Sequence, residues 1–423
     1  MNNYNIKICV FGLGYVGLPL VISFGKKYSV VGFDKNIKRI HQLKNKIDKN
    51  NEIKKNQFNY AKKLSFTSNI IDLKTCNIFI VTVPTPIKKN KTPDLSFLIE
   101  ACKNIAKFLK EKDIVIFEST VYPGTTQEVC VPILKRISKL KYNVDFFCGY
   151  SPERINPNDK KHTLSNIIKI TSGSNKKTTD FVDKLYKSIV TAGTYKASSI
   201  EIAEAAKVIE NAQRDLNIAF MNELALIFNK LNINTHEVLK AASTKWNFLN
   251  FKPGLVGGHC IGVDPYYLTY KSIKSGYTPK IITAGRNIND KFVNYVLWKA
   301  IHNTKKIFYN VNLRFLVLGV TFKENCVDYR NSKSIELIMK LKSKFNLVHC
   351  YDPLLKENDF NENNQIKLSN KLRKNYYHCI ILSVPHNIFK KIGEKKLKTY
   401  LIKGGLFFDV KNFFPKNKQN LYL

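Results

Sequence analysis

One cysteine in the chain has the neighbours of a covalent catalyst. Cys260 lies in the run Gly257-Gly258-His259-Cys260-Ile261-Gly262-Val263, which ends in Asp264-Pro265. The glycines allow a tight turn around the thiol, and Asp264 adds a carboxylate four residues after it. A thiolate is strongly nucleophilic and also leaves readily from a thioester. We therefore expect Cys260 to bond covalently to a substrate.

The other eight cysteines lack such neighbours. The total of nine is odd, which argues against a disulfide framework. No two cysteines have the Cys-x-x-Cys spacing of a zinc ribbon, so we predict no metal site. We expect the remaining thiols to be small buried hydrophobic groups, namely Cys9, Cys76, Cys102, Cys130, Cys148, Cys326, Cys350 and Cys379.

A glycine-rich turn near the start predicts a dinucleotide site. The run Gly12-Leu13-Gly14-Tyr15-Val16-Gly17 follows an apolar stretch, residues 6–11, and opens a helix-like segment. Such spacing lets the backbone approach a pyrophosphate at a helix N-terminus; without a ligand it would be a tight turn and a helix cap. Asp34 follows the next predicted strand, where an acid binds the adenosine ribose and favours NAD over NADP. Together with Cys260, this pattern predicts an NAD-dependent dehydrogenase.

Further residues are expected at the cofactor. Arg39, one turn into the following helix, is predicted to close over the adenosine half, although an exposed surface position explains it nearly as well. Thr85, Ser119 and Thr120 fall just past the carboxyl ends of two predicted strands. Because ligands bind at that edge of open α/β sheets, these three residues are expected to form walls of the nicotinamide pocket.

Lys207 and Asn211 lie four residues apart in a long helical pattern, so both project from one helix face. An ammonium and an amide side by side can stabilise an oxyanion. By spacing alone, the pair would be an ordinary polar stripe. Asp264 is open to two interpretations as well, a general base beside Cys260 or a cap of the segment that begins at Pro265.

The elements that must position these residues form three predicted domains of an α/β protein. With 423 residues the chain exceeds what one core supports, and we place the domains at residues 1–197, 198–309 and 310–423. Alternating strands and helices in the first domain predict a doubly wound parallel sheet. We expect its strands at residues 6–11, 30–33, 78–83, 114–117 and 144–147, and a helix at 95–109.

The central and last domains differ from each other in pattern. A helical run from Ser199 to Leu231 predicts a spine helix for a central all-helical domain and for a dimer interface. We expect further helices at residues 237–242 and 281–302. The last domain is predicted to be a smaller Rossmann-like sheet, with strands at residues 314–320, 347–351, 379–384 and 406–410 and a helix at 334–344.

The formal charge of +37 makes nucleic acid the first binding partner to consider. However, the lysines are spread along the whole chain among many Asn and Ile residues, as expected from coding composition on solvated faces. The charge should instead favour an anionic substrate. No apolar run reaches the length of a membrane span, and no signal-peptide pattern precedes the first strand. We expect a cytoplasmic protein that binds neither nucleic acid nor membrane.

In the order of its motifs, the chain resembles the UDP-sugar 6-dehydrogenases over nearly its whole length. Besides the glycine turn and the Cys260 segment, the matching motifs are Glu118-Ser119-Thr120-Val121-Tyr122-Pro123-Gly124-Thr125, Ser151-Pro152-Glu153-Arg154, Lys207-x-x-x-Asn211 and Thr321-Phe322-Lys323-Glu324-Asn325-Cys326-x-Asp328-x-Arg330-Asn331-Ser332. The resemblance implies oxidation of a sugar C6 alcohol to a carboxylate by two NAD in succession, through a thiohemiacetal and a thioester on Cys260.

The same resemblance implies a role for each matched residue. Lys207 would stabilise oxyanions with help from Asn211, Asp264 and Thr120 would hold or activate water, and Glu153 would be the general base of hydrolysis. Arg330 would reach the cofactor. The substrate would be bound by Glu153, Arg154, Lys207, Asn211, Gly257 and Gly258, with Phe322, Lys323 and Lys411 contacting its UDP part.

Two departures from the pattern of UDP-glucose enzymes bear on the substrate. Pro157 stands where those enzymes commonly have a second Glu, and Ile261 stands where they have an aromatic residue. The chain is more similar to the branch that acts on UDP-N-acetylhexosamines, and residues 245–256 favour UDP-N-acetylglucosamine or UDP-N-acetylgalactosamine. UDP-glucose and UDP-N-acetylmannosamine remain alternatives. So do a dehydrogenase of a single oxidation and a non-catalytic nucleotide-sugar-binding protein. We expect a homodimer or a higher homo-oligomer that supplies surface polysaccharide or lipopolysaccharide synthesis.

Overall fold

The computed structural model describes residues 5–50, 52–153, 162–357, 360, 366–369, 371–415 and 420–423. Contacts divide the chain into two compact units. The first unit comprises Met1–Glu210 and Tyr266–Thr278, and the second comprises Asn211–Pro265 and Pro279–Leu423. The division into three domains at residues 198 and 310 stays a prediction.

The first unit is built on an eight-stranded sheet in the order β3-β2-β1-β4-β5-β6-β7-β8. All neighbours pair in parallel except β6 and β7, which are antiparallel. The strands are β1 (Lys7–Phe11), β2 (Ser29–Phe33), β3 (Leu64–Thr67), β4 (Ile78–Val81), β5 (Ile114–Phe117), β6 (Phe147–Tyr150), β7 (Lys169–Gly173) and β8 (Thr194–Lys196).

Both faces of this sheet are buried, as the nearly continuous apolar strands predict. Successive strand residues point to opposite faces, so Cys9 and Phe11 of β1 belong to one core cluster, and Ile8 and Val10 belong to another. The helices of this unit are α1 (Gly17–Gly25), α2 (Ile37–Lys44), α3 (Ser96–Ala106), α4 (Val131–Ser138) and α5 (Lys176–Lys187). Helices α3 and α4 cover the first face, whereas α1 and α5 cover the second.

Short helical segments connect these elements. Two are 3₁₀ helices, η1 (Lys55–Tyr60) and η2 (Ile70–Thr75), and one is a π-helix, η3 (Thr126–Cys130).

The sixth strand differs from the sequence prediction. The expected strand at residues 144–147 is wrong because Val144 is 67% exposed and residues 141–146 form a turn, in which Asp145 accepts the backbone N–H of Lys141 at 2.7 Å. The strand begins only at Phe147. Strands β3, β7 and β8 were not predicted, since they carry polar residues among their apolar ones.

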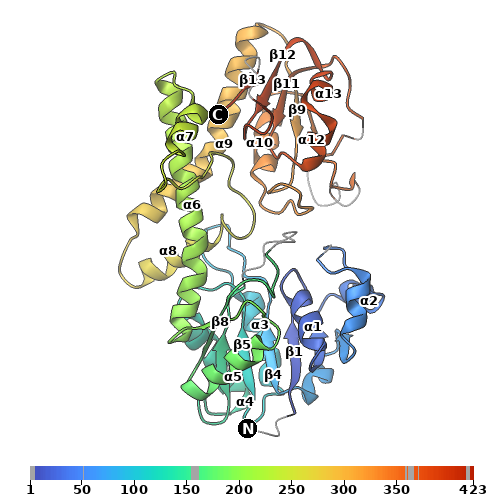
Figure 1. The fold of residues 1–423 in the computed structure, drawn as a ribbon, viewed down its shortest axis with the longest axis vertical. Coiled ribbons are helices and arrows are strands. Elements are labelled where there is room, and N and C mark those ends of the chain that lie inside the picture. The colour runs from blue at the N-terminus through green and yellow to red at the C-terminus, as the bar shows by residue number, and fades with distance from the viewer. Residues whose placement is uncertain are drawn as a thin grey trace. The chain divides into compact units, whose positions relative to one another are not determined.

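Helix α6 (Ile200–Lys230) confirms the predicted spine helix and is a single element of 31 residues, unbroken in Figure 1. Its residues up to Glu210 belong to the first unit, and the rest belong to the second. The other helices of the helical region are α7 (Thr235–Ala242), α8 (Asp264–Lys274) and α9 (Lys280–Ile307). Helix α8 was not predicted as a helix. None of the described helices combines the length and apolarity that a membrane span requires.

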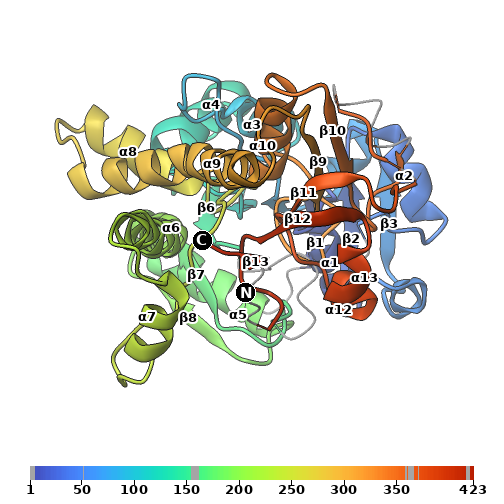
Figure 2. The same cartoon turned by 90° about the horizontal axis from the view of Figure 1, so that it is seen from above.

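The second unit contains a five-stranded sheet in the order β10-β9-β11-β12-β13, with all neighbours parallel. Helices α9 and α10 contribute to the core on one face, and α12 and α13 to the core on the other, as Figure 2 shows for α10, α12 and α13. The elements are β9 (Arg314–Leu318), α10 (Lys333–Lys342), β10 (Leu347–Tyr351), β11 (Tyr377–Leu382), α12 (Asn387–Ile392), α13 (Glu394–Lys398), β12 (Leu401–Asp409) and β13 (Asn420–Leu421).

Candidate active site

The glycine turn lies at the topological switch point of the first sheet, between the carboxyl ends of β1 and β4. Gly12 has φ +89°, a conformation that L-residues with side chains rarely adopt. A methyl group at Gly17 would come within 1.8 Å of the Gly12 carbonyl oxygen, so this glycine permits close packing of the turn on α1. Gly14 is exposed, with open space where a methyl group would be. The three glycines therefore suit a tight turn whose backbone a pyrophosphate can approach.

Asp34 and Arg39 both hold this turn. The Asp34 carboxylate accepts the backbone N–H of Leu13 and of Asn36, each at 2.9 Å, and remains partly exposed. The Arg39 side chain donates from Nε to the Leu13 carbonyl at 3.0 Å and pairs with Asp48 at 2.8 Å. Arg39 thus braces the turn from which the adenosine half would be bound, a structural role that the sequence did not reveal.

Thr85, Ser119 and Thr120 are brought together as the sequence suggested. Thr85 donates its hydroxyl to the Thr120 carbonyl at 2.6 Å, and Ser119 donates to the Val83 carbonyl at 2.6 Å. Tyr267 of α8 fixes the same region by donating to the Thr85 carbonyl at 2.7 Å. The loops after β4 and β5 therefore form one hydrogen-bonded edge beside the glycine turn.

Glu153 is buried beside a charged cluster that the sequence analysis missed. Lys169 of β7 donates to Glu118 at 2.6 Å and lies 3.9 Å from the Glu153 carboxylate. Tyr186 of α5 also donates to Glu118. Burial raises the pKa of the Glu118 carboxyl, while the Lys169 ammonium lowers it and the Glu153 carboxylate raises it. The sequence did contain a signal for this cluster, the single lysine Lys169 between Ile168 and Ile170. Because burial of an unpaired ammonium is costly, a lysine in an apolar strand indicates a carboxylate partner.

Lys207 is buried on α6, and the carboxylate residue Glu204 lies one turn before it. Glu204 accepts the backbone N–H of Gly124 at 2.6 Å and both the N–H and the hydroxyl of Thr126. Burial raises the pKa of Glu204 to about 7. Since the loop of residues 119–126 includes Thr120, Glu204 anchors a segment that carries a predicted catalytic residue.

In the second unit, Cys260 differs from every other cysteine. It lies in the turn of residues 258–263 and is partly exposed, whereas the other eight are buried. Burial raises the pKa of the Cys350 and Cys379 thiols to about 12, which keeps those sulfurs protonated. Exposure is one requirement of a reactive thiol, and Cys260 meets it.

Asp264 and Asn211 lie beside this turn. The backbone N–H of Asp264 donates to the Cys260 carbonyl at 2.8 Å, where α8 begins. Its buried carboxylate accepts the Asn211 amide at 2.6 Å. Asp264 is thus the first residue of α8, and its carboxylate orients the Asn211 side chain.

Phe322, one of the predicted UDP residues, lies in a loop between β9 and α10, Gly319–Ser332, which we call the nucleotide loop. It starts at the switch point between β9 and β11. The loop packs directly on the cysteine segment, because Gly258 donates to the Asn331 carbonyl at 3.1 Å and a methyl group at Gly258 would come within 2.6 Å of the Phe322 ring.

Three further predicted residues are positioned on or near the nucleotide loop. Lys323 lies on it, with its ammonium 5.9 Å from the centre of the Phe322 ring. Lys411, which follows β12, forms an ion pair with Glu324. Arg330 forms an ion pair with Asp328. Arg154 lies outside the described residues.

The predicted catalytic residues come from both units. Thr120, Glu153 and Lys207 belong to the first, and Asn211, Cys260 and Asp264 belong to the second. All predicted cofactor residues belong to the first unit except Arg330. Within the described ranges, no group of three His, Cys, Asp or Glu side chains is arranged to hold a metal ion.

Comparison with known proteins gives a family for this arrangement. Three models of the UDP-glucose/GDP-mannose dehydrogenase family match the chain in order, the NAD binding domain at residues 6–190, the central domain at 201–291 and the UDP binding domain at 316–416. The chain belongs to this family. It is an NAD-dependent nucleotide-sugar dehydrogenase, and the fit of the glycine turn to a dinucleotide agrees with that.

Individual members of the family are similar over their whole length. A UDP-N-acetyl-D-glucosamine 6-dehydrogenase of Pseudomonas aeruginosa is 51% identical, with 99% of this chain and 100% of that protein covered. One of Salmonella typhi is 50% identical, with 99% of each covered. Among solved structures, a UDP-D-ManNAc dehydrogenase of Pyrococcus horikoshii has a TM-score of 0.87 at 27% identity and covers 99% of this chain and 98% of that chain. These matches confirm the predicted fold class.

Proposed function

We propose that the protein oxidises the C6 hydroxyl of a UDP-N-acetylhexosamine, UDP-N-acetylglucosamine above all, to the uronate. The observation that carries the proposal is the single partly exposed cysteine in a turn that the nucleotide loop contacts. The substrate is supported by the names of the two relatives at about half identity, 51% and 50%. The relatives named as UDP-N-acetyl-D-mannosamine dehydrogenases are less similar, at 32–34% identity.

When bound, NAD would supply the hydride acceptor for each of the two oxidations at C6. Between the two oxidations, the protein keeps C6 of the sugar covalently bound. We propose that the Cys260 thiolate adds to the C6 aldehyde to give a thiohemiacetal, and that the next oxidation leaves a thioester. Water then attacks the acyl carbon, the C–S bond breaks, and the thiolate and the carboxylate are released. The alcohol, one water and two NAD would thus yield a carboxylate, two NADH and three protons.

The remaining residues support these steps. The Lys207 ammonium and the Asn211 amide stabilise the oxyanions of addition and hydrolysis. Because one Asn211 amide hydrogen is committed to Asp264 at 2.6 Å, the orientation of that amide is fixed before substrate binds. Glu153 takes the proton of the attacking water, and Thr120 and Asp264 hold that water.

The residues that the sequence predicted for binding of the cofactor and the substrate are part of the proposal. The glycine turn, Tyr15, Val16, Asp34 and Arg39 hold the dinucleotide, with Thr85, Ser119 and Thr120 at its nicotinamide end and Arg330 reaching it from the nucleotide loop. Phe322, Lys323 and Lys411 contact the UDP part, and Arg154, Gly257 and Gly258 contact the substrate.

The proposal also covers the oligomeric state, the cellular location and the use of the product. We propose a homodimer or a higher homo-oligomer formed around α6, supported by apolar side chains of this helix that are 45–53% exposed, namely Ile202, Ile209, Phe220 and Ile227. We propose that the enzyme is cytoplasmic and that its uronate is a precursor of surface polysaccharide or lipopolysaccharide, which the family resemblance implies.

A stoichiometry assay over a panel of UDP-sugars tests the proposed reaction. For UDP-N-acetylglucosamine we expect two NADH for each carboxylate formed. Cys260→Ala should form no uronate while NAD and UDP still bind. Cys379→Ala, which removes a buried thiol of the same unit, should keep the wild-type ratio. One NADH with a carbonyl product would instead indicate a single oxidation, and binding without NADH would indicate a non-catalytic protein.

A further inference from the structure

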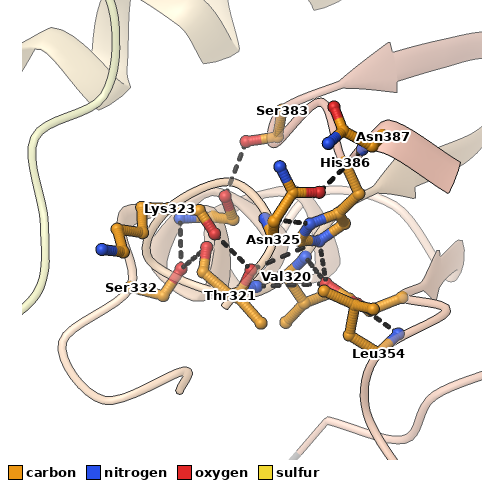
Figure 3. A network of polar contacts seen from close by, with 11 residues as sticks. Val320, Thr321, Lys323, Asn325, Ser332, Leu354, Ser383, His386 and Asn387 are labelled. Atoms are coloured by element: carbon orange, nitrogen blue, oxygen red, sulfur yellow. Dashed lines mark hydrogen bonds and ion pairs between the residues drawn. The ribbon is translucent and has the colours of Figure 1, made fainter. Parts of the chain in front are cut away.

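A completely buried histidine lies beneath the nucleotide loop. His386 follows β11, across the switch point from β9, and its side chain has no exposed surface. Figure 3 shows it between Asn325 and Thr321 of the loop. No sequence motif marked this residue, which comes from a different part of the chain than the loop that it contacts.

The hydrogen bonds of His386 fix its tautomer. Nδ1 lies 2.9 Å from the backbone nitrogen of Asn325, whose N–H can only donate, so Nδ1 carries no proton. Nε2 lies 3.0 Å from the Asp352 carboxylate and 3.3 Å from the Thr321 hydroxyl. Because the carboxylate accepts, Nε2 carries the proton. The ring is therefore a neutral bridge, with an acceptor toward the loop and a donor toward Asp352.

The same carboxylate holds the start of the loop. Asp352 accepts the backbone N–H of Val320 at 2.7 Å and that of Thr321 at 3.2 Å. The Asn325 side chain accepts the backbone N–H of Asn387 at 2.8 Å, which ties the loop to the start of α12. Phe322 and Lys323 thus lie on a segment that His386 and Asp352 fix on both sides.

We propose that His386 is a positioning residue of the UDP site. It contacts neither the substrate nor the cofactor but fixes the backbone that presents Phe322 and Lys323 to the nucleotide. This inference rests on the proposed function, which places UDP at that loop. Loss of the Nδ1 acceptor leaves the Asn325 N–H without its partner, so the loop is no longer held in the binding conformation and UDP affinity falls.

The same strand supplies a matched control. His378 in β11 is also buried, and its Nδ1 accepts the backbone N–H of Arg314 at 3.0 Å. Arg314 is the first residue of β9, whereas the nucleotide loop follows the last one. A substitution at His378 therefore removes a similar buried hydrogen bond away from the loop.

The test is calorimetric binding of UDP, and separately of NAD, to four full-length variants: His386→Phe, His386→Asn, His378→Phe and His378→Asn. We expect His386→Phe to raise the Kd of UDP and the KM of the nucleotide sugar at least about tenfold, the equivalent of one well-placed hydrogen bond. His386→Asn, which keeps an acceptor near the Nδ1 position, should stay within about threefold of wild type. Both His378 variants should bind UDP as wild type does, and the Kd of NAD should be unchanged throughout.

The outcomes separate this inference from the function on which it rests. UDP binding within twofold of wild type by His386→Phe, or equal losses in the His386 and His378 variants, would overturn the positioning role while the proposed reaction stands. If His386→Phe does not fold, the two Asn variants decide, since the proposal also fails when His386→Asn binds UDP no better than a loop variant, Phe322→Ala. A wild-type protein that does not bind UDP would overturn both.

Discussion

The two sheets begin with the same turn and use it differently. In each, a glycine with positive φ follows the first strand, Gly12 at +89° and Gly319 at +82°, and its N–H donates at 2.9 Å to the last residue of the neighbouring strand. In each, an aspartate after that strand accepts loop amides, Asp34 from Leu13 and Asp352 from Val320. The starting geometry is therefore duplicated within one chain.

The two aspartates differ in whether their carboxylate is still accessible from solvent. Asp34 is partly exposed, and α1 begins only a few residues after Gly12, so both the carboxylate and the helix N-terminus lie beside the glycine turn. Asp352 is 3% exposed and bonded to His386, and the longer nucleotide loop precedes α10. One aspartate is thus available to a ribose, while the other is part of the scaffold of its loop.

The two glycines should respond unequally to a methyl group, and this is the largest effect that we expect. An added Cβ at Gly319 would lie 2.2 Å from the Val384 carbonyl oxygen, whereas one at Gly12 would lie 3.1 Å from that of Thr82. Gly319→Ala should destabilise the second unit by about 4 kcal/mol or more, and Gly12→Ala should cost the first unit about 1–3 kcal/mol. Hydrogen exchange resolved by peptide measures each unit separately. Equal protection losses would contradict the comparison.

Substitution of the two aspartates should change different quantities, the stability of the second unit for Asp352 and the affinity for NAD for Asp34. Asp352→Ala leaves buried amides and His386 without their acceptor, so we expect a loss of about 3 kcal/mol in the second unit. Asp34 is itself partly exposed, so water can take the place of its carboxylate in Asp34→Ala, and the loss should be less than about 1 kcal/mol. Its NAD affinity should nevertheless fall about tenfold, since the ribose loses its acceptor. Denaturant unfolding and NAD titration of both variants provide the measurement. If Asp34→Ala bound NAD normally, the carboxylate would be scaffold in both units.

The pH dependence of the first unit should be governed in part by Glu204. Its pKa is raised by burial from 4.5 to about 7, so the folded state binds this proton more tightly than the unfolded state. The resulting stabilisation is complete below pH 4.5 and is lost as the pH rises through about 7, with an upper limit of about 3 kcal/mol. Glu204→Gln should reduce the loss of stability with rising pH in the loop of residues 119–126. An unchanged slope in exchange-derived stability between pH 5 and 8 would refute this assignment.

The sequence predicted those features that local chemistry determines. The strand before Gly12, the spine helix α6 and the cysteine turn each have a short-range signature, a glycine spacing or an apolar period, and each was found. Strands β7 and β8 were missed because their side chains are partly polar. The Lys169 cluster and His386 were missed for a different reason. Their partners, Glu118 and Asn325, are distant in sequence and meet only through the sheet order.

The account depends most on the covalent step at Cys260. The most direct measurement is mass spectrometry of turnover mixtures quenched in acid, with Glu153→Gln used to slow hydrolysis of the thioester. We predict a tryptic peptide from Trp246 to Lys271 that carries the mass of the acyl nucleotide sugar on Cys260, and its absence in Cys260→Ala. A peptide that stays unmodified while free aldehyde accumulates would contradict the account.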